Sequence, residues 1–328
     1  MLKVTLKLSC SLFIITWLLK SGELDFSLSQ LFLKNYKSTI LIFILCYSII
    51  VLLGSLRWKM LLQSGEQKNL PFKNIFKISW IGLFFNSVLP GAVTGDLIKL
   101  AYVKDLGKNI TKTFMLSTVF IDRIIGLLGL LCLSGVFSIY NYTKIVSISP
   151  SLKALVHLNF LLFIGAIIFM LTLFLSKNWQ KAILSPMDSI PILGKKIKGL
   201  LEQVWLIGNK KNLFFKCLFI SIIVQTISVC LFWKIIMPFT STPLSIGHAF
   251  IFIPLGFIAM AIPIAPSGLG VGHAIFGTLF SFFGIQKGAS LFNLYFLCVV
   301  FCNLTGCIPY ILTGKKYSDQ QLEQVSTV

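Results

Sequence analysis

Long runs of apolar residues, separated by short polar segments, dominate the hydrophobic pattern of this chain. A helix needs roughly 20 predominantly apolar residues to cross the hydrocarbon core of a bilayer. Six segments fit this requirement, at about residues 4–19, 38–56, 113–140, 154–175, 212–237 and 289–313. The pattern therefore predicts an all-α protein, a polytopic membrane helix bundle with about six full spans.

Two further apolar regions are interrupted near their middle by proline and glycine. The first covers about residues 75–103 and breaks at LPGAVTG, and the second covers about 245–285 and breaks at PIAPSGLGVG. Proline lacks a backbone donor and glycine adopts conformations that other residues avoid, so neither region can be one continuous helix. Each region is expected to form two short helices joined by a non-helical break.

The positions of lysine and arginine indicate how the broken regions thread, because cytoplasmic loops are enriched in these residues. Basic residues flank the first broken region on both sides, within 57–77 and 99–112. A single crossing would leave one group outside, whereas a hairpin that enters and returns keeps both groups inside. The same reasoning puts the basic segment 177–211 and both termini in the cytoplasm. We therefore expect two re-entrant helical hairpins that enter from opposite faces.

Composition supports a membrane protein and disfavours other classes. The chain is 56% hydrophobic and 12% charged, and a soluble domain could not cover that apolar surface with so few polar groups. The net charge of +19 then reflects lysines in loops rather than a nucleic-acid surface. The eight cysteines show no metal-ligand spacing, so we expect free thiols, no metal and no cofactor. A single transmembrane domain, 1–313 with an uncleaved first span, and a polar cytoplasmic tail, 314–328, are expected.

The two breaks together predict an internal polar cavity. Unpaired backbone groups are costly in hydrocarbon, so a non-helical break persists only where protein buries it or where it lines a wet cavity. Helices that restart near Asp96 and Gly272 would aim their N-terminal N–H groups at this cavity. Freedom at the joints is expected from the prolines and glycines of the breaks: Pro90, Gly91, Gly95, Pro266, Gly268, Gly270 and Gly272.

Ionisable residues inside apolar segments point to the same place. Asp122 and Arg123 lie about 12 Å into the third predicted span, counted at 1.5 Å per residue. Adjacent residues of a helix do not face each other, so we expect different partners for them, and Asp96 and Lys99 are the natural candidates. Two interpretations stay open: an ion-pair network that only locks the first hairpin to this span, or one that also contacts a charged substrate.

Three more polar positions near the breaks each have two interpretations. Asp96 could act as a helix N-cap, which would not exclude a role in function. Asn86 could line the cavity or satisfy the broken backbone. His273 could be a protonatable group in the cavity or a polar group near the outer surface. Together, the candidate substrate-binding residues are Asn86, Asp96, Lys99, Asp122, Arg123 and His273.

Three stretches carry a family resemblance. FFNSVLPGAVTGDLIKLAYV, VFIDRIIGLLGL and PIAPSGLGVGHAIF, in this order, resemble the marks of the lysylphosphatidylglycerol synthase transmembrane-domain family, also called flippase-like proteins. The resemblance covers about residues 40–313 and is to the stand-alone form without the soluble synthase domain. It implies movement of an aminoacylated or glycosylated lipid between leaflets. The family commonly has arginine where this chain has Lys99, and Arg-Glu where it has Gly272-His273, so recognition of a lysyl headgroup does not carry over.

A lipid or glycolipid flippase is therefore the expected function. The alternative is an accessory or scaffolding membrane protein of a cell-envelope lipid or polysaccharide pathway. A lipid-modifying transferase fits less well, because the acids outside the spans show no paired-carboxylate or metal-ligand spacing, and we expect no enzyme. The expected partners are membrane lipids, anionic or glycosylated, without nucleic acid. The expected location is the cytoplasmic membrane of a bacterium or archaeon, with many passes.

The re-entrant threading of 75–103 can be tested by labelling. Single cysteines at Lys73 and Lys108, in a background without native cysteines, should react with an impermeant thiol reagent from the same side of the membrane. The reason is that both basic groups are expected in the cytoplasm. Right-side-out and inverted vesicles provide the measurement, and labelling from opposite sides would show that the region crosses.

Overall fold

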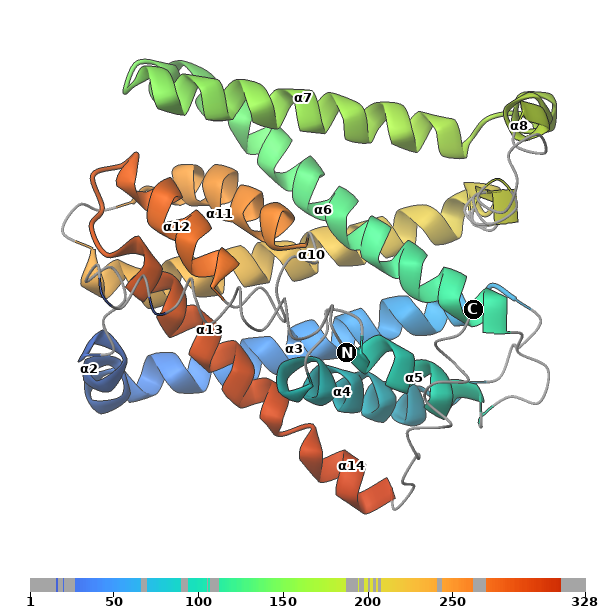
Figure 1. Cartoon of the computed structure of the whole chain (residues 1–328), viewed down its shortest axis with the longest axis horizontal. Coiled ribbons are helices and arrows are strands. Elements are labelled where there is room, and N and C mark those ends of the chain that lie inside the picture. The colour runs from blue at the N-terminus through green and yellow to red at the C-terminus, as the bar shows by residue number, and fades with distance from the viewer. Residues whose placement is uncertain are drawn as a thin grey trace.

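The computed structural model of the chain describes residues 16, 20, 27–65, 70–89, 94–104, 106, 112–186, 194, 198–199, 201–202, 205, 208–240, 244–261 and 270–313. Across these residues the regular elements are helices and no strand occurs, which confirms the predicted all-α bundle (Figure 1). The longer elements are α2 (Ser27–Asn35), α3 (Lys37–Leu62), α4 (Phe72–Val88), α5 (Thr94–Lys104), α6 (Lys112–Val146), α7 (Pro150–Leu173), α8 (Lys177–Leu184), α10 (Lys211–Ile236), α11 (Ile246–Met260), α12 (Val271–Ser281) and α13 (Gly288–Leu304). The short helices η2 (Met237–Phe239) and α14 (Cys307–Thr313) complete the set.

Five helical segments in the described part of the chain are long and apolar enough to cross a membrane. They are Lys37–Leu62, Phe114–Val146, Pro150–Leu173, Lys211–Phe239 and Gly288–Thr313. These five correspond to five of the six predicted spans. The sixth, 4–19, lies outside the described residues except for residue 16, and the tail 314–328 lies wholly outside them.

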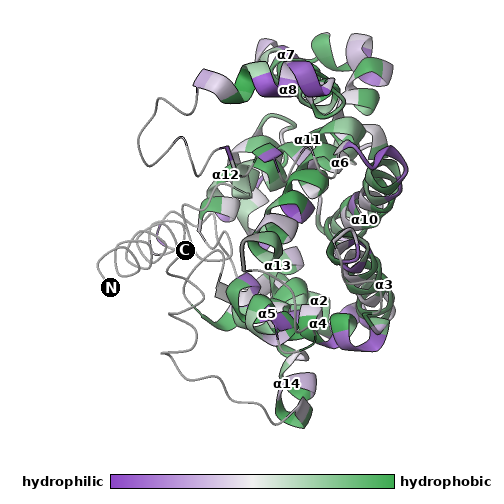
Figure 2. Ribbon diagram, turned by 90° about the vertical axis from the view of Figure 1, so that its right-hand side faces the viewer, coloured by the Kyte–Doolittle hydropathy of each residue, from purple (hydrophilic) through white to green (hydrophobic). Residues whose placement is uncertain are grey.

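Large apolar side chains on the outer faces of the spans are exposed, as expected for surfaces that contact lipid. Figure 2 shows hydrophobic residues along most of the helices. On α7 the exposed side chains recur at helical spacing and include Leu158, Leu161, Ile164, Ile168 and Leu171. The protein is therefore embedded in a membrane.

The two interrupted regions each form a pair of short helices. α4 ends at Val88 and α5 begins at Thr94, while α11 ends at Met260 and α12 begins at Val271. Within each pair the two helices pack against each other. The prediction that each region forms two short helices is confirmed, whereas the connecting residues 90–93 and 262–269 lie outside the described residues and the re-entrant threading stays a prediction. Pro90, Gly91, Pro266 and Gly268 lie outside the described residues.

The glycines next to the breaks differ in their roles. A Cβ on Gly95 would overlap the carbonyl oxygen of Gly82, so the close approach of α4 and α5 requires glycine there. A Cβ on Gly272 would lie 2.6 Å from Cζ of Phe292, so Gly272 also serves packing. Gly270, with a φ of 81°, adopts a conformation that favours glycine at the start of α12. The structure thus assigns close packing to Gly95 and Gly272, two positions from which the sequence predicted freedom at the joints.

The centre of the bundle is α6, which packs against α3, α7, α10 and α11. A buried amide fixes α7 to it: Ser134 donates to Asn159 Oδ1 at 3.0 Å, and Asn159 Nδ2 donates to Ser138 Oγ at 2.8 Å. On the other side, Ser221 of α10 donates to the carbonyl of Ile125 at 2.9 Å. A Cβ on Gly129 would lie 3.0 Å from Cβ of Ser221, so small residues set the distance between α6 and α10.

Substitution of Gly129 should therefore destabilise the bundle. Gly129→Ala is expected to lower the free energy of unfolding by about 1–3 kcal/mol, because a methyl group must be forced against the backbone of α10. Gly165→Ala on α7 is the matched control, since no heavy atom lies within 4 Å of the added Cβ. Thermal unfolding in detergent measures both, and an equal loss in the two variants would contradict the packing argument.

Candidate functional site

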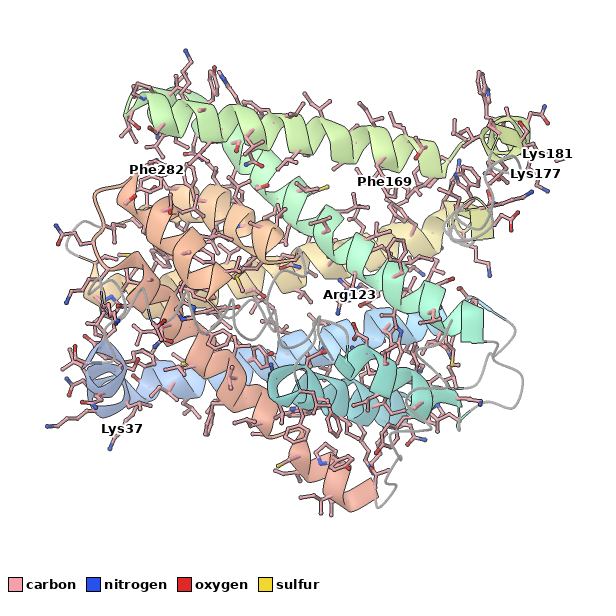
Figure 3. The ribbon with its side chains drawn as sticks, in the orientation of Figure 1. Lys37, Arg123, Phe169, Lys177, Lys181 and Phe282 are labelled. Atoms are coloured by element: carbon pink, nitrogen blue, oxygen red, sulfur yellow. The ribbon has the colours of Figure 1, made fainter. Side chains whose placement is uncertain are left out.

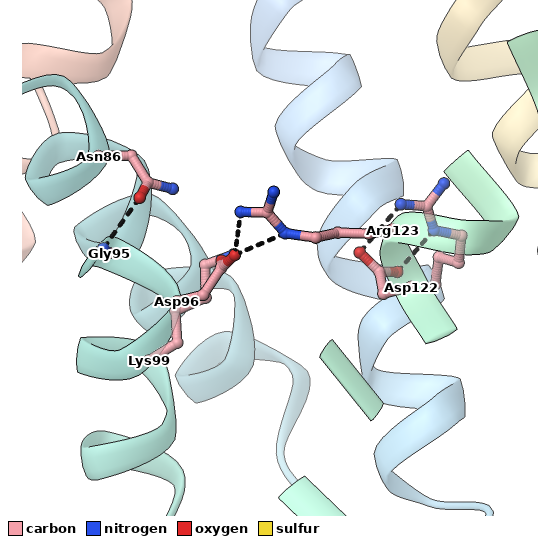
Figure 4. A network of polar contacts seen from close by, with 7 residues as sticks. Asn86, Gly95, Asp96, Lys99, Asp122 and Arg123 are labelled. Atoms are coloured by element: carbon pink, nitrogen blue, oxygen red, sulfur yellow. Dashed lines mark hydrogen bonds and ion pairs between the residues drawn. The ribbon is translucent and has the colours of Figure 1, made fainter. Parts of the chain in front are cut away.

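Asp122 and Arg123 are neighbours on α6 and point to opposite sides of it (Figure 4). Asp122 faces α3, and Arg123 reaches across to α5. Arg123 lies in the interior of the molecule, whereas Lys37, Lys177 and Lys181 lie near its ends (Figure 3). The prediction that the two neighbours have different partners is confirmed.

Asp96 collects two cations at the start of α5. Asp96 as a whole residue is 4% exposed. Its Oδ2 accepts from Arg123 Nε at 2.9 Å and from Arg123 Nη2. Its Oδ1 lies 2.8 Å from Lys99 Nζ, one turn further along the helix. The position is also favourable for an acid, because the first turn of a helix carries partial positive charge. Both carboxylate oxygens are thus engaged, as a buried acid requires.

Lys99 is fixed by more than Asp96. Its ammonium lies 5.5 Å from the centroid of the Trp58 ring on α3, within range of a cation–π interaction. Its aliphatic stem fills the space where a Cβ of Gly82 would lie. Lys99 thereby connects α5 to α3. The sequence had suggested Lys99 as a partner of Asp122, but Asp122 pairs with another residue.

The partner of Asp122 is Arg57 near the end of α3. Arg57 Nε donates to Oδ1 at 2.7 Å and Nη2 donates to Oδ2 at 3.0 Å, a forked geometry typical of strong Arg–carboxylate pairs. The Arg57 side chain is 10% exposed. The sequence reasoning missed Arg57, because it counted this residue with the cytoplasmic basic group that follows residue 56. The signal was present in the apolar residues that continue after it, since Trp58, Leu61 and Leu62 are also buried.

Asn86 closes the first broken region. It lies near the end of α4, and its Oδ1 accepts from the backbone N–H of Gly95 at 2.9 Å. It also lines a cavity between the two broken regions, so both interpretations considered for Asn86 apply. The bond spans the break and holds the beginning of α5 against the end of α4.

His273 has a similar place at the second broken region. It is 1% exposed, its Nδ1 accepts from the N–H of Gly270 at 3.3 Å, and its Nε2 lies 3.2 Å from Oδ1 of Asn293. Because Nδ1 accepts, Nε2 carries the proton and donates. Asn293 in turn donates to Ser29 of α2 at 3.4 Å. His273 is therefore buried by protein, and it is absent from the described residues that line the cavity.

A cavity of about 470 Å³ lies between the ends of α4 and α11, bordered also by α3, α6, α10 and α13. The described residues that line it are Tyr47, Ile50, Asn86, Ser87, Arg123, Leu130, Val224, Gln225, Ser228, Phe257, Met260, Ala261, Phe292, Tyr295, Phe296, Val299, Val300 and Asn303. Since Ser87 and Met260 are close to the two breaks, the described ends of both broken regions border one cavity, whose lining mixes apolar and polar side chains. Its volume lies in the range of small-molecule sites.

Arg123 is the charged member of this lining, as far as the described residues extend. Its side chain is 47% exposed, although its guanidinium is paired with Asp96. Asp96, Lys99 and Asp122 do not appear in the lining and stand behind Arg123. The site therefore offers a half-exposed cation that is supported by a buried acid.

Other described residues of the lining carry neutral polar groups. Tyr47 donates to Asn303 Oδ1 at 2.7 Å, and Asn303 Nδ2 donates to Ser87 Oγ at 2.9 Å. These bonds tie α3, α13 and α4 together. Gln225 of α10 donates to the carbonyl of Gly126 at 3.3 Å. The part of the chain that is described contains no group of three His, Cys, Asp or Glu side chains placed to hold a metal ion.

Comparisons with known proteins agree with the sequence resemblance. A family model described as "Lysylphosphatidylglycerol synthase TM region" matches residues 4–300. The chain is also similar to a curated "UPF0104 membrane protein" from Pyrococcus horikoshii, with 23% identity over 275 residues, which covers 77% of this chain and 79% of the relative. No solved structure matches. The matched residues include both broken regions and the Asp122–Arg123 pair.

The Arg57–Asp122 pair should contribute strongly to stability. Arg57→Gln or Asp122→Asn alone leaves a charge buried without its partner, which typically costs about 3–5 kcal/mol of unfolding free energy. The double variant should lose clearly less than the sum of the single losses, because neither charge then remains. Thermal or denaturant unfolding in detergent measures the cycle, with Lys177→Gln on exposed α8 as the control. Additive losses would contradict a direct pairing.

Proposed function

The chain belongs to the lysylphosphatidylglycerol synthase transmembrane-region family, and we propose that it moves lipids between leaflets by passing a polar headgroup through the cavity beside Arg123. The observation that carries this proposal is a half-exposed arginine that lines a cavity inside an apolar bundle. An ionised side chain is costly inside a membrane and usually marks a substrate or ion pathway. The proposed location is the cytoplasmic membrane, with both termini in the cytoplasm.

The cavity would replace water around the headgroup. A phosphate cannot cross hydrocarbon unaided, because an isolated charge there has lost its hydration. The guanidinium of Arg123 offers charge-assisted hydrogen bonds with a forked geometry that matches phosphate oxygens. Asn86, Gln225 and Asn303 add amide groups that can bond hydroxyls.

The paired state of Arg123 does not prevent this role. When Arg123 turns toward a headgroup, Asp96 keeps Lys99 at 2.8 Å, so the buried carboxylate is not left without a cation. This matters because an uncompensated buried charge would cost several kcal/mol. The headgroup could thus replace Asp96 as the partner of Arg123 at a moderate cost in free energy.

Two apolar grooves give the lipid tails a place outside the cavity. A groove of about 400 Å³ runs between α13 and the α2–α3 segment, and Val300 lines both this groove and the cavity. A second groove of about 300 Å³ lies between α3, α4 and α14, and Tyr47 lines both it and the cavity. The tails can remain in the apolar grooves while the headgroup occupies the polar space on the other side of α13.

Alternating access would follow from movement of one broken pair of helices against the bundle. In transporters built from discontinuous helices, the substrate lies between the two broken elements and the gates move around it. The cavity here lies between α4 and α11, which supports the same arrangement for this chain.

Substitution of Arg123 tests the function. In vesicles that contain the purified protein, Arg123→Gln should slow the redistribution of a lipid between leaflets by at least about tenfold, the effect of losing one charge-assisted hydrogen bond. Arg123→Lys should retain part of the rate, because it keeps the charge and loses the fork. Lys153→Gln, on the exposed face of α7, is the control. Full activity of folded Arg123→Gln protein would refute the proposal.

A further inference from the structure

We propose that the headgroup carried by this protein is anionic and free of amines, so that its substrates are anionic phospholipids with hydroxylated headgroups rather than aminoacylated lipids. This inference rests on the proposed function and specifies its substrate class. The supporting observations are the charges around the cavity and the neutral polar groups that line it.

The charged cluster beside the cavity has an excess of positive charge. It contains three cations, Arg57, Lys99 and Arg123, and two carboxylates, Asp96 and Asp122. One positive charge is therefore uncompensated within these five side chains. Arg123 is the member of the cluster that reaches the cavity, and its side chain is the most exposed of the five. An anion at Arg123 would bring the cluster to neutrality, which is the favourable state at low dielectric.

An ammonium group would need a carboxylate, and none is among the described residues that line the cavity. Asp96 is shared by two cations and Asp122 is held at both oxygens by Arg57. Neither carboxylate is among the described residues of the lining. The connecting stretches 90–93 and 262–269 contain no charged residue in the sequence, so the breaks add no acid.

Aromatic rings are the other way to bind an ammonium group, and here they are engaged with one another. Tyr295 stacks on Phe232 with ring centroids 4.7 Å apart and on Phe257 at 5.7 Å, and Phe292 stacks on Phe276 at 4.9 Å. Any ammonium in the same space would also be repelled by Arg123. Repulsion from Arg123 therefore acts against cationic headgroups, and the described part of the lining carries no acid that would offset it.

The neutral lining matches hydroxyl groups. Asn86, Gln225 and Asn303 carry both donors and acceptors, and Ser228 and Tyr47 add hydroxyls. Such groups bond a glycerol or sugar headgroup without regard to charge. The combination of one cation and several amides thus fits a phosphate that bears a polyol.

Phosphatidylglycerol and lysylphosphatidylglycerol form a matched pair of probes, because they differ only by the lysyl ester. Water-soluble dioctanoyl forms of each are titrated against the purified protein, with the thermal unfolding midpoint as the readout of binding. Movement of the long-chain forms is measured in vesicles, by periodate oxidation of the glycerol diol for the first lipid and by an impermeant amine reagent for the second.

The glycerol lipid should bind at least about tenfold more tightly than its lysyl ester and should move faster, because the lysyl ammonium groups are repelled by Arg123. Folded Arg123→Gln protein should lose this preference, while Lys153→Gln protein should keep it. Equal or tighter binding of the lysyl ester would overturn the inference. If the preference in binding is present but neither lipid moves, the substrate class stands and the transport proposal fails.

Discussion

The burial of Asp96 is the constraint on which the arrangement around the first break depends. A carboxylate that is 4% exposed inside an apolar bundle cannot remain ionised without cations, and this one has two. Arg123 brings α6 to the start of α5, and Lys99 connects the same carboxylate to the Trp58 ring of α3. The bond from Gly95 to Asn86 then sets where α5 begins. Asp96 and its two cations thus position α3, α5 and α6, and the Asn86–Gly95 bond positions the break beside them.

The two breaks are closed in the same way and held by different forces. At each break, a glycine N–H donates to a nearby side chain, Asn86 in the first case and His273 in the second. The first hairpin contacts α6 through ion pairs, whereas the second contacts α13 through stacked rings such as Phe276 and Phe292. Ion pairs can be exchanged for a charged ligand, but separating the rings would expose apolar surface to a polar cavity. Under the proposed function, the α4–α5 pair is therefore the part of the site that would respond to a charged ligand.

The local sequence pattern was sufficient to predict five of the membrane spans and part of the candidate site. Apolar length located five of the spans, and the rule that adjacent helical residues diverge separated the partners of Asp122 and Arg123. Arg57 was missed because a charge at the end of an apolar run has the same local signature whether it lies in a loop or pairs inside the bundle. The Tyr47–Asn303 bond joins residues 256 apart and leaves no periodic trace. Packing at Gly95 depends on Gly82 of the neighbouring helix, which spacing alone does not reveal.

The two arginine pairs of α6 differ in a way that separates structure from function. Arg57 and Asp122 are 10% and 22% exposed, match each other at both oxygens, and lie away from the cavity lining. The Arg123 side chain is 47% exposed, and its partner Asp96 is also paired with a second cation, Lys99. A buried pair in which the arginine engages both oxygens of the acid resists exchange, since breaking it isolates two charges. In a pair that shares its acid, loss of one cation leaves the acid compensated by the other. Under the proposed function, the neighbouring residues Asp122 and Arg123 would thus provide a fixed contact and an exchangeable one.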